Sequence, residues 1–216
     1  MDITIKSSWN SLTWKEYEQL EQILTTDIPE TYKTLHIISL LSGTPVDTLE
    51  RLPITELKKL LPALDFLTTE PETRYHKYNY TINGREYDFK GKIEEITTAQ
   101  YIDYRSYMDE EQKDIVKLMS VFLIPTGHEY NDGYDMELVM KDIADMNWLD
   151  LRAASFFFRL QLAAFILILK SSLLKTMKKS KATKEEMKKV KGSLNNMAYY
   201  LLFAEFVNWQ SLPSTL

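Results

Sequence analysis

The first 25 residues change from a strand-like to a helix-like pattern of apolar positions. The run Ile3–Lys6 alternates apolar and polar residues, as a short β-strand does. From Tyr17 to Leu24 the apolar residues recur at helical spacing. Thr13 is placed to cap this helix, and Glu16, three residues further on, completes a capping box. The pattern predicts a strand followed by a helix.

Two further helical segments are expected before residue 62. The second helix runs from about Pro29 and ends at Gly43, because glycine adopts the left-handed closing conformation without a steric cost. Residues 46–61 predict one or two short helices, with Pro53 in the first turn of the second piece, where its missing N–H is not needed.

A β-hairpin follows. Residues 75–82 alternate tyrosine with polar residues, Asn83-Gly84 comes next, and residues 85–89 resume an aromatic alternation. Both central residues of a type I′ turn need positive φ, which asparagine and glycine tolerate best. The sequence therefore predicts a hairpin whose turn is Asn83-Gly84.

The apolar pattern of the N-terminus returns 84 residues later. The first copy contains Ile3, Ile5, Trp9, Leu12, Thr13 and Tyr17, and the second contains Tyr87, Phe89, Ile93, Ile96, Thr97 and Tyr101. Residues 35–41 are matched by 116–122, now 81 residues apart, and, more weakly, 52–57 by 146–151; the offset of 84 holds for the first set. A constant offset across a strand, a cap and a helix predicts an internal duplication. We expect strand-plus-helices units, with a hairpin strand paired against residues 3–5.

The C-terminal third begins with the segment Leu151–Leu169, which is apolar nearly all round. A membrane span needs about 20 such residues without charge, and here Arg159 and Gln161 interrupt the run. A buried central helix is the preferred interpretation over a transmembrane one. Residues 175–191 hold eight lysines and two glutamates, and a last aromatic helix is expected over 194–209. Together they predict an antiparallel helical hairpin with a lysine-coated connection.

The predicted fold class is mainly α with a small β-hairpin or sheet. Residues 1–74 form the first repeat unit, and residues 75–150 form the hairpin plus the second repeat unit. Residues 151–216 form an apolar helix and a lysine-rich helical hairpin packed on the repeats.

Residues 123–135 differ from the corresponding part of the first copy. Proline and glycine hold this segment out of helix, and it is the best candidate for an exposed recognition loop. Its proposed partner contacts are Pro125, His128, Tyr130, Asp132, Tyr134 and Asp135. A calcium loop is the alternative for these acidic residues, but the residue order and distant glutamate of an EF-hand are missing.

Charge and composition limit the cellular compartments and the partners that fit this chain. The chain has 216 residues, net charge −5 and no cysteine, which excludes disulfides and favours a reducing cytosol. The start of the sequence lacks the basic and apolar runs of a signal peptide. Residues 1–150 carry 15 Lys and Arg against 28 Asp and Glu, net −13, whereas residues 151–216 carry 11 against 3, net +8. An acidic body and a basic tail attract each other, a neighbouring copy, or a polyanion.

Catalytic motifs are missing from the sequence. No glycine stands in a phosphate-binding loop or a dinucleotide fingerprint, and there is no cysteine or G-x-S-x-G nucleophile. His36, His76 and His128 lie far apart and form no metal-ligand pair. We therefore expect a protein that is not an enzyme, with no cofactor and no metal; a site assembled only in three dimensions is the alternative.

The lysine-rich segment offers a second candidate contact. Sequence-blind binding of phosphates would use Lys178, Lys179, Lys181, Lys184, Lys188 and Lys189. Lysines without arginines or stacking aromatics between them are a weak signal of nucleic-acid binding. A solvated helical face is the preferred interpretation.

Three stretches carry a family resemblance: residues 8–17, 100–104 and 122–135. Over about residues 8 to 165 the chain resembles small proteins of tailed bacteriophages of gut Bacteroides, including crAss-like phages. Some of these look like tail-assembly chaperones, and others look like virion structural or cargo proteins. The basic aromatic C-terminus is not part of this pattern.

The resemblance implies a phage protein that acts by protein–protein contacts in the virion or its assembly, including as packaged cargo. Its partners would be other phage structural or assembly proteins or further copies of itself, in the host cytoplasm during assembly or in the virion. The alternatives are a tail-assembly chaperone and a binder of nucleic acid or a membrane surface through the lysines.

Overall fold

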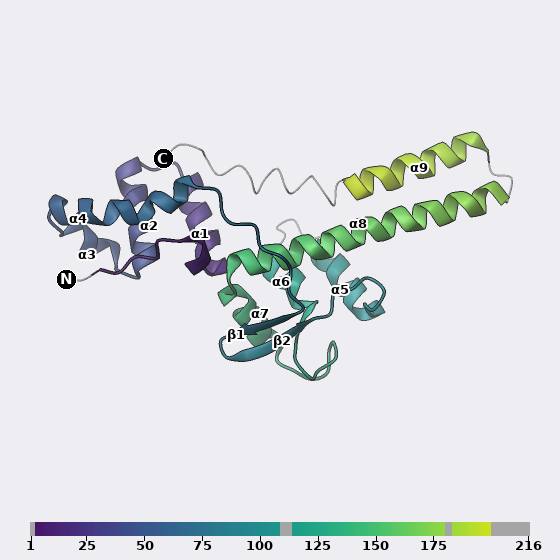
Figure 1. The fold of residues 1–216 in the computed structure, drawn as a ribbon, viewed down its shortest axis with the longest axis horizontal. Coiled ribbons are helices and arrows are strands. Elements are labelled where there is room, and N and C mark those ends of the chain that lie inside the picture. The colour runs from purple at the N-terminus through teal and green to yellow at the C-terminus, as the bar shows by residue number, and fades with distance from the viewer. Residues whose placement is uncertain (1–2, 109–113, 180–182, 200–216) are drawn as a thin grey trace.

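Short helices form the N-terminal part of the computed structural model, which describes residues 3–108, 114–179 and 183–199 (Figure 1). The elements are η1 (Trp9–Ser11), α1 (Trp14–Thr25), α2 (Glu30–Ser42), α3 (Val46–Glu50), α4 (Ile54–Leu60) and η2 (Leu61–Thr68). The predicted capping box is confirmed, since Glu16 N donates to Thr13 Oγ1 at 3.2 Å and Thr13 N to Glu16 Oε2 at 2.9 Å. Gly43 ends α2 with φ of 69°. Pro53 lies one position before α4, as its N-cap.

The predicted strand at Ile3–Lys6 is wrong. This segment is irregular, and Lys6 N donates to Leu41 O at 3.1 Å near the end of α2. Ile3 and Ile5 pack against a cluster that includes Leu35 of α2. The alternation does bury one side of the segment, but the surface that covers that side is a helix.

A three-stranded antiparallel sheet follows, in the order β1 (Asn79–Ile82), β2 (Arg85–Phe89) and β3 (Leu123–Pro125). The hairpin is confirmed, with φ of 49° at Asn83 and 76° at Gly84. Strand β3 takes the edge expected for residues 3–5, and it lies inside the segment expected to be loop. That loop prediction is wrong for residues 123–125, because Leu123 and Ile124 are buried and apolar and pair with β2.

The remaining elements are α5 (Thr98–Met108), α6 (Ile115–Ser120), α7 (Met136–Asp145), α8 (Trp148–Lys179) and α9 (Lys184–Tyr199). Helix α5 begins with a cap at the predicted offset, since Gln100 N donates to Thr97 Oγ1 at 3.2 Å. However, Tyr101 is 48% exposed, whereas its match Tyr17 is 3% exposed. The two helix starts share a cap but differ in strand and packing, so the duplication stays a prediction.

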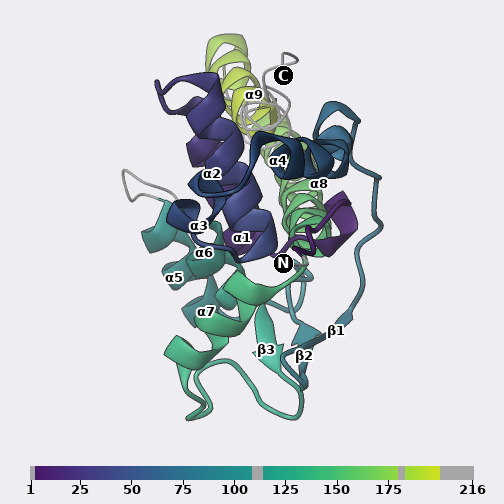
Figure 2. The ribbon, with the colours of Figure 1, turned by 90° about the vertical axis from the view of Figure 1, so that its left-hand side faces the viewer.

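Aromatic side chains join the N-terminal helices to the start of α8. Trp148 stacks on Tyr17 with ring centroids 4.2 Å apart and 3° between the planes. Its Nε1 donates to Trp9 O at 2.8 Å, and the Trp9 ring lies 5.5 Å from that of Trp148. Figure 2 shows α8 running behind the N-terminal helices toward α9. One core therefore holds parts of the chain about 140 residues apart.

The expected buried central helix is right only for the first turns of α8. Leu151, Ala154 and Phe158 are buried, but from Leu160 onward large apolar side chains are exposed. Figure 1 shows the reason: α8 continues past the body, with α9 antiparallel along it. The helical hairpin is confirmed, its lysines lie on both helices, and residues 200–209 of the expected last helix lie outside the described residues.

A buried carboxylate ties the hairpin to α7. Asp142 accepts hydrogen bonds from Arg85 Nε at 2.6 Å, Arg85 Nη2 at 2.7 Å and Asn83 Nδ2 at 3.0 Å, and from the Tyr87 hydroxyl. Mainly through the Arg85 hydrogen bonds, the pKa of Asp142 is lowered to about 2. The charged carboxylate therefore stabilises the fold.

We predict that Asp142→Asn lowers the free energy of unfolding by about 2 kcal/mol at pH 7. Because the pKa of Asp142 in the folded protein, about 2, lies below the ordinary 3.8, its stabilisation is complete above that ordinary value and is lost as the pH falls toward 2. Urea unfolding followed by tryptophan fluorescence between pH 2 and 7 measures both effects. The variant should show a shallower acid dependence, the exposed-site control Asp132→Asn should behave like wild type, and equal slopes in all three proteins would contradict the prediction.

Candidate interaction site

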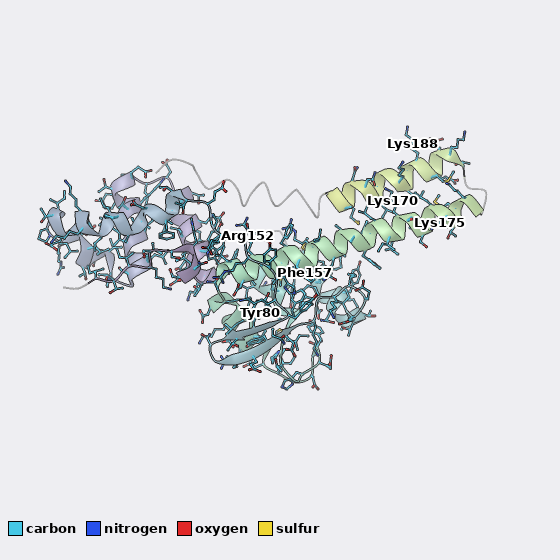
Figure 3. The ribbon with its side chains drawn as sticks, viewed as in Figure 1. Tyr80, Arg152, Phe157, Lys170, Lys175 and Lys188 are labelled. Carbon is cyan, nitrogen blue, oxygen red and sulfur yellow. The ribbon has the colours of Figure 1, made fainter. Side chains whose placement is uncertain are left out.

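The outer part of the helical hairpin stands away from the body (Figures 1 and 3). We call residues 160–179 of α8 together with α9 the arm. Its helices pack on each other along one seam, in which Met187, Val190, Leu194 and Ala198 of α9 are buried or half-buried at heptad-like spacing. Lys170 Nζ donates to Asn195 Oδ1 across the same seam. The seam uses only one face of α8.

The other faces of the α8 part of the arm are apolar and exposed. The large exposed side chains are Leu160, Phe165, Leu167, Ile168, Leu169 and Leu173, with Ile168 65% exposed. Soluble proteins rarely leave contiguous apolar patches of more than a few hundred Å² without a partner. By length and composition α8 also qualifies as a membrane-crossing helix, a test that core helices pass too, but only 17% of its most apolar stretch is buried. The arm is therefore the main exposed apolar surface of the described chain.

One apolar stripe of the arm continues the side of α8 that packs on the body. Phe158 is buried in the core. Leu162, Phe165 and Leu169 follow it at steps of four, three and four residues, which places them on the same helix face. Ile168 flanks this stripe. We call Leu162, Phe165, Ile168 and Leu169 the bare stripe: Leu162 still packs partly against the core, and Phe165, Ile168 and Leu169 are exposed.

Lysines surround the tip of the arm. The exposed ones are Lys175 and Lys178 on α8 and Lys184, Lys188, Lys189 and Lys191 on α9. Figure 3 shows Lys175 and Lys188 at the far end of the hairpin. Of the predicted phosphate contacts, the structure thus brings four together; Lys181 lies outside the described residues, and only the backbone of Lys179 is described.

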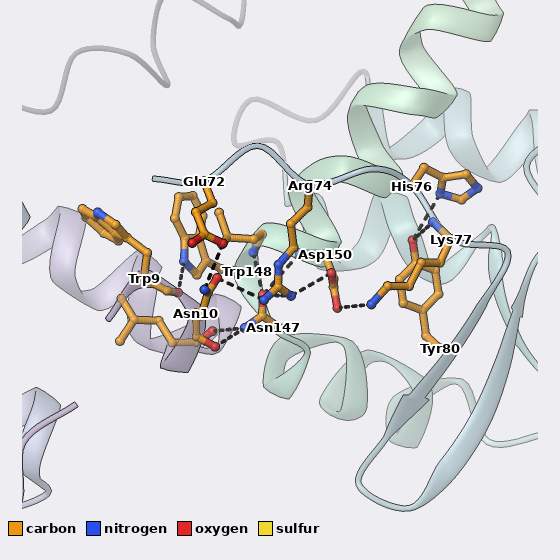
Figure 4. A network of polar contacts seen from close by, with 12 residues as sticks. Trp9, Asn10, Glu72, Arg74, His76, Lys77, Tyr80, Asn147, Trp148 and Asp150 are labelled. Carbon is orange, nitrogen blue, oxygen red and sulfur yellow. Dashed lines mark hydrogen bonds and ion pairs between the residues drawn. The ribbon is translucent and has the colours of Figure 1, made fainter. Parts of the chain in front are cut away.

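The base of the arm is fixed by a polar network that the sequence reasoning missed (Figure 4). Arg74 donates to Asp150 Oδ1 at 2.9 Å, to Asn147 Oδ1 at 3.1 Å and to Asn10 Oδ1 at 3.0 Å. Lys77 Nζ lies 3.2 Å from the second oxygen of Asp150. Since these hydrogen-bond partners come from widely separated segments of the chain, no local sequence pattern predicts the network. With the Trp148 contacts they fix the direction in which α8 leaves the body.

The predicted recognition loop is held against the body. Asp135 caps α7, accepting from Glu137 N at 3.0 Å and Leu138 N at 3.2 Å. The Tyr130 hydroxyl donates to Asp103 Oδ2 at 2.6 Å, and Lys90 Nζ donates to His128 O at 2.8 Å. Pro125 ends β3, and Tyr134 is half-buried. Of the six predicted contacts, Asp132 is the one left mainly exposed without a structural bond to another element. The loop is a weaker interaction candidate than the arm.

A polar hollow of about 450 Å³ lies between the hairpin and the start of α8. Lys77, Asn83 and Asp150 line it, but their charged and amide groups already bond to one another or to Asp142. Among the described residues no group of three His, Asp or Glu side chains is placed to hold a metal ion.

The three histidines lie in different surroundings. His36 is exposed on α2, and His128 lies in the loop before α7. His76 stacks on Phe157 at 4.1 Å between centroids, and burial lowers its pKa to about 4, so it is neutral at pH 7. It packs as an aromatic side chain.

Comparisons with protein-family models, with curated proteins and with solved structures gave no match to this chain. Its function therefore has to be inferred from its own residues and geometry.

We predict that two matched substitutions, two residues apart and therefore on nearly opposite faces of α8, behave differently. Ile166→Ala should loosen the seam by about 2 kcal/mol, because Ile166 is 7% exposed and the change leaves a cavity. Ile168→Ala should stay within about 0.5 kcal/mol of wild type. Hydrogen exchange of the α9 amides, followed by mass spectrometry, should speed up roughly 30-fold in the first variant alone. Equal exchange in both variants would mean that α9 does not cover Ile166.

Proposed function

We propose that the protein is a non-enzymatic interaction protein that binds a protein partner through its arm. The observation that carries the proposal is the bare stripe, an apolar surface held at a fixed angle to the body by buried side chains at its base. Burial of apolar area is the main source of association free energy in protein complexes. We further propose, from the resemblance, that the setting is the virion or the assembly line of a tailed phage.

Two physical arguments favour a protein partner over a membrane. The bare stripe lies on the same face of α8 as Phe158, which is buried against the body, so a flat bilayer pressed on the stripe would collide with the body. End-on insertion would drive the tip lysines through the hydrocarbon, and each lysine at the centre of a spanning helix costs about 3 kcal/mol. A partner helix about 10 Å across has neither problem. The partner chemistry that fits is an apolar helix with acidic residues near the end that meets the tip.

We predict that a photo-crosslinking residue at Ile168 captures a phage structural or assembly protein, or a second copy, during particle production. Mass spectrometry of purified particles and of soluble assembly intermediates identifies the adduct. The same crosslinker at Tyr75, a 90% exposed residue of the body, is the matched control and should give no such adduct. Adducts to lipid or nucleic acid, or equal adducts from both positions, would contradict the proposal.

The clustered lysines support a second candidate, a binder of polyanions. It predicts that binding to duplex DNA or to anionic vesicles falls steeply with salt and disappears when Lys178, Lys184, Lys188 and Lys189 become glutamine. Under the proposal for the arm, the same variant keeps its crosslink from Ile168.

A further inference from the structure

The partner of the bare stripe must be narrow. Phe158, on the same face of α8 as the stripe, is buried in the core, and Figure 1 shows the body beside the first turns of α8 only. The body therefore closes one end of the space along the stripe. Gln161 Oε1 accepts a hydrogen bond from Ile93 N at 3.3 Å, which locates that end of the stripe. A single helix that runs along α8 fits this space, and its end then stops beside residue 93.

The residues beside that end are acidic. Glu94 and Glu95 directly follow Ile93 and are both exposed. Glu95 pairs with Lys92 at 3.3 Å, and no described cation pairs with Glu94. They belong to the part of the chain, residues 1–150, whose net charge is −13. A partner helix that fits the stripe should therefore end in basic residues.

The arm of the chain is itself such a helix. Its bare stripe is apolar, and its tip carries six exposed lysines against Glu185 and Glu186. Among the described residues, the tip points away from the acidic body, which therefore offers its lysines no counter-charge (Figure 3). The 17 steps from Leu162 to Lys179 rise about 26 Å at 1.5 Å per residue, which is the length over which two such arms can overlap.

We propose that two copies of this chain pair their arms antiparallel, bare stripe against bare stripe, so that the lysine tip of each reaches Glu94 and Glu95 of the other. This inference rests on the proposed function and names the partner of the same surface. A two-fold axis near residue 168 places Ile168 opposite Leu169 and Phe165 opposite Ser172. Phe165 then meets the small side chain of Ser172, and Ile168 and Leu169 pack on each other at the axis, as apolar side chains do in paired helices. Lys175 and Lys178 lie near residues 159–162 of the other copy, next to its acidic pair.

The first experiment measures self-association of the full chain. Sedimentation equilibrium should show a monomer–dimer equilibrium, and Ile168→Glu should abolish the dimer, because it places two carboxylates at the axis without a counter-charge. Circular dichroism confirms that this variant keeps its helices, since Ile168 is exposed in the monomer. Because the chain has no cysteine, Ile168→Cys offers a direct geometric test. It should form disulfide-linked dimers on mild oxidation, and Ser193→Cys, exposed on α9, should not.

The second experiment tests the charged contact by exchange. A tip variant, Lys175→Glu with Lys178→Glu, and an edge variant, Glu94→Lys with Glu95→Lys, should each dimerise roughly tenfold more weakly than wild type. Mixed together they should form a heterodimer, because every tip then faces an edge of opposite charge. Restoration in the mixture would not occur if the substitutions had merely damaged the fold.

The outcomes separate this inference from the proposed function. Monomers at all concentrations, equal disulfide formation at both cysteine positions, or no restoration in the mixture overturns the paired arms. Flotation of the wild type, but not of Ile168→Glu, with vesicles of anionic phospholipid would also overturn them. If dimers are absent but the Ile168 crosslink names a different phage protein, the proposed function stands and only the identity of the partner is wrong.

Discussion

The indole of Trp148 is the contact on which the rest of the molecule depends. It stacks on Tyr17 of α1 and donates to the backbone of Trp9 at 2.8 Å, and it is the first residue of α8. Next to it, the α1 and α8 starts exchange backbone hydrogen bonds, Trp14 N to Met146 O at 2.8 Å and Trp148 N to Leu12 O at 3.2 Å. A helix that begins inside the core cannot swing freely. The N-terminal helices thereby determine where an apolar surface more than ten residues further along α8 is presented.

Features that depend on neighbours in sequence were predictable. The Thr13 capping box, the Asn83-Gly84 turn and the Gly43 helix end each require only a few adjacent residues, and the chain uses them as expected. The choice of sheet partner was not, because the alternation of residues 3–5 indicates that one side is buried and says nothing about what covers it. A helix covers them, and the third strand comes from residues 123–125.

The candidate site was predicted only in part, because its residue types are visible in the sequence but its packing partners are not. The lysines and the apolar run that form the arm were both visible in the sequence. The sequence does not show that the body stops covering this face of α8 after Leu162, so that Phe165, Ile168 and Leu169 are exposed. An all-round apolar helix looks identical whether the same molecule or another one supplies its packing partner. In the loop of residues 125–135 the error ran the other way: residues expected to be free for a partner are used inside the molecule. Its polar residues were interpreted as recognition groups, yet Asp135 and Tyr130 are used for a helix cap and a tie to α5.

The hydrogen bond between Lys170 and Asn195 lies at the exposed edge of the seam between α8 and α9. Beside it, Met187, Val190, Leu194 and Ala198 of α9 are buried or half-buried. If α9 slid along α8 by one turn, this hydrogen bond would be lost and all four apolar side chains would have to find new positions. The apolar seam and the polar pair at its edge therefore favour the same alignment, which sets the distance from the body to the basic tip.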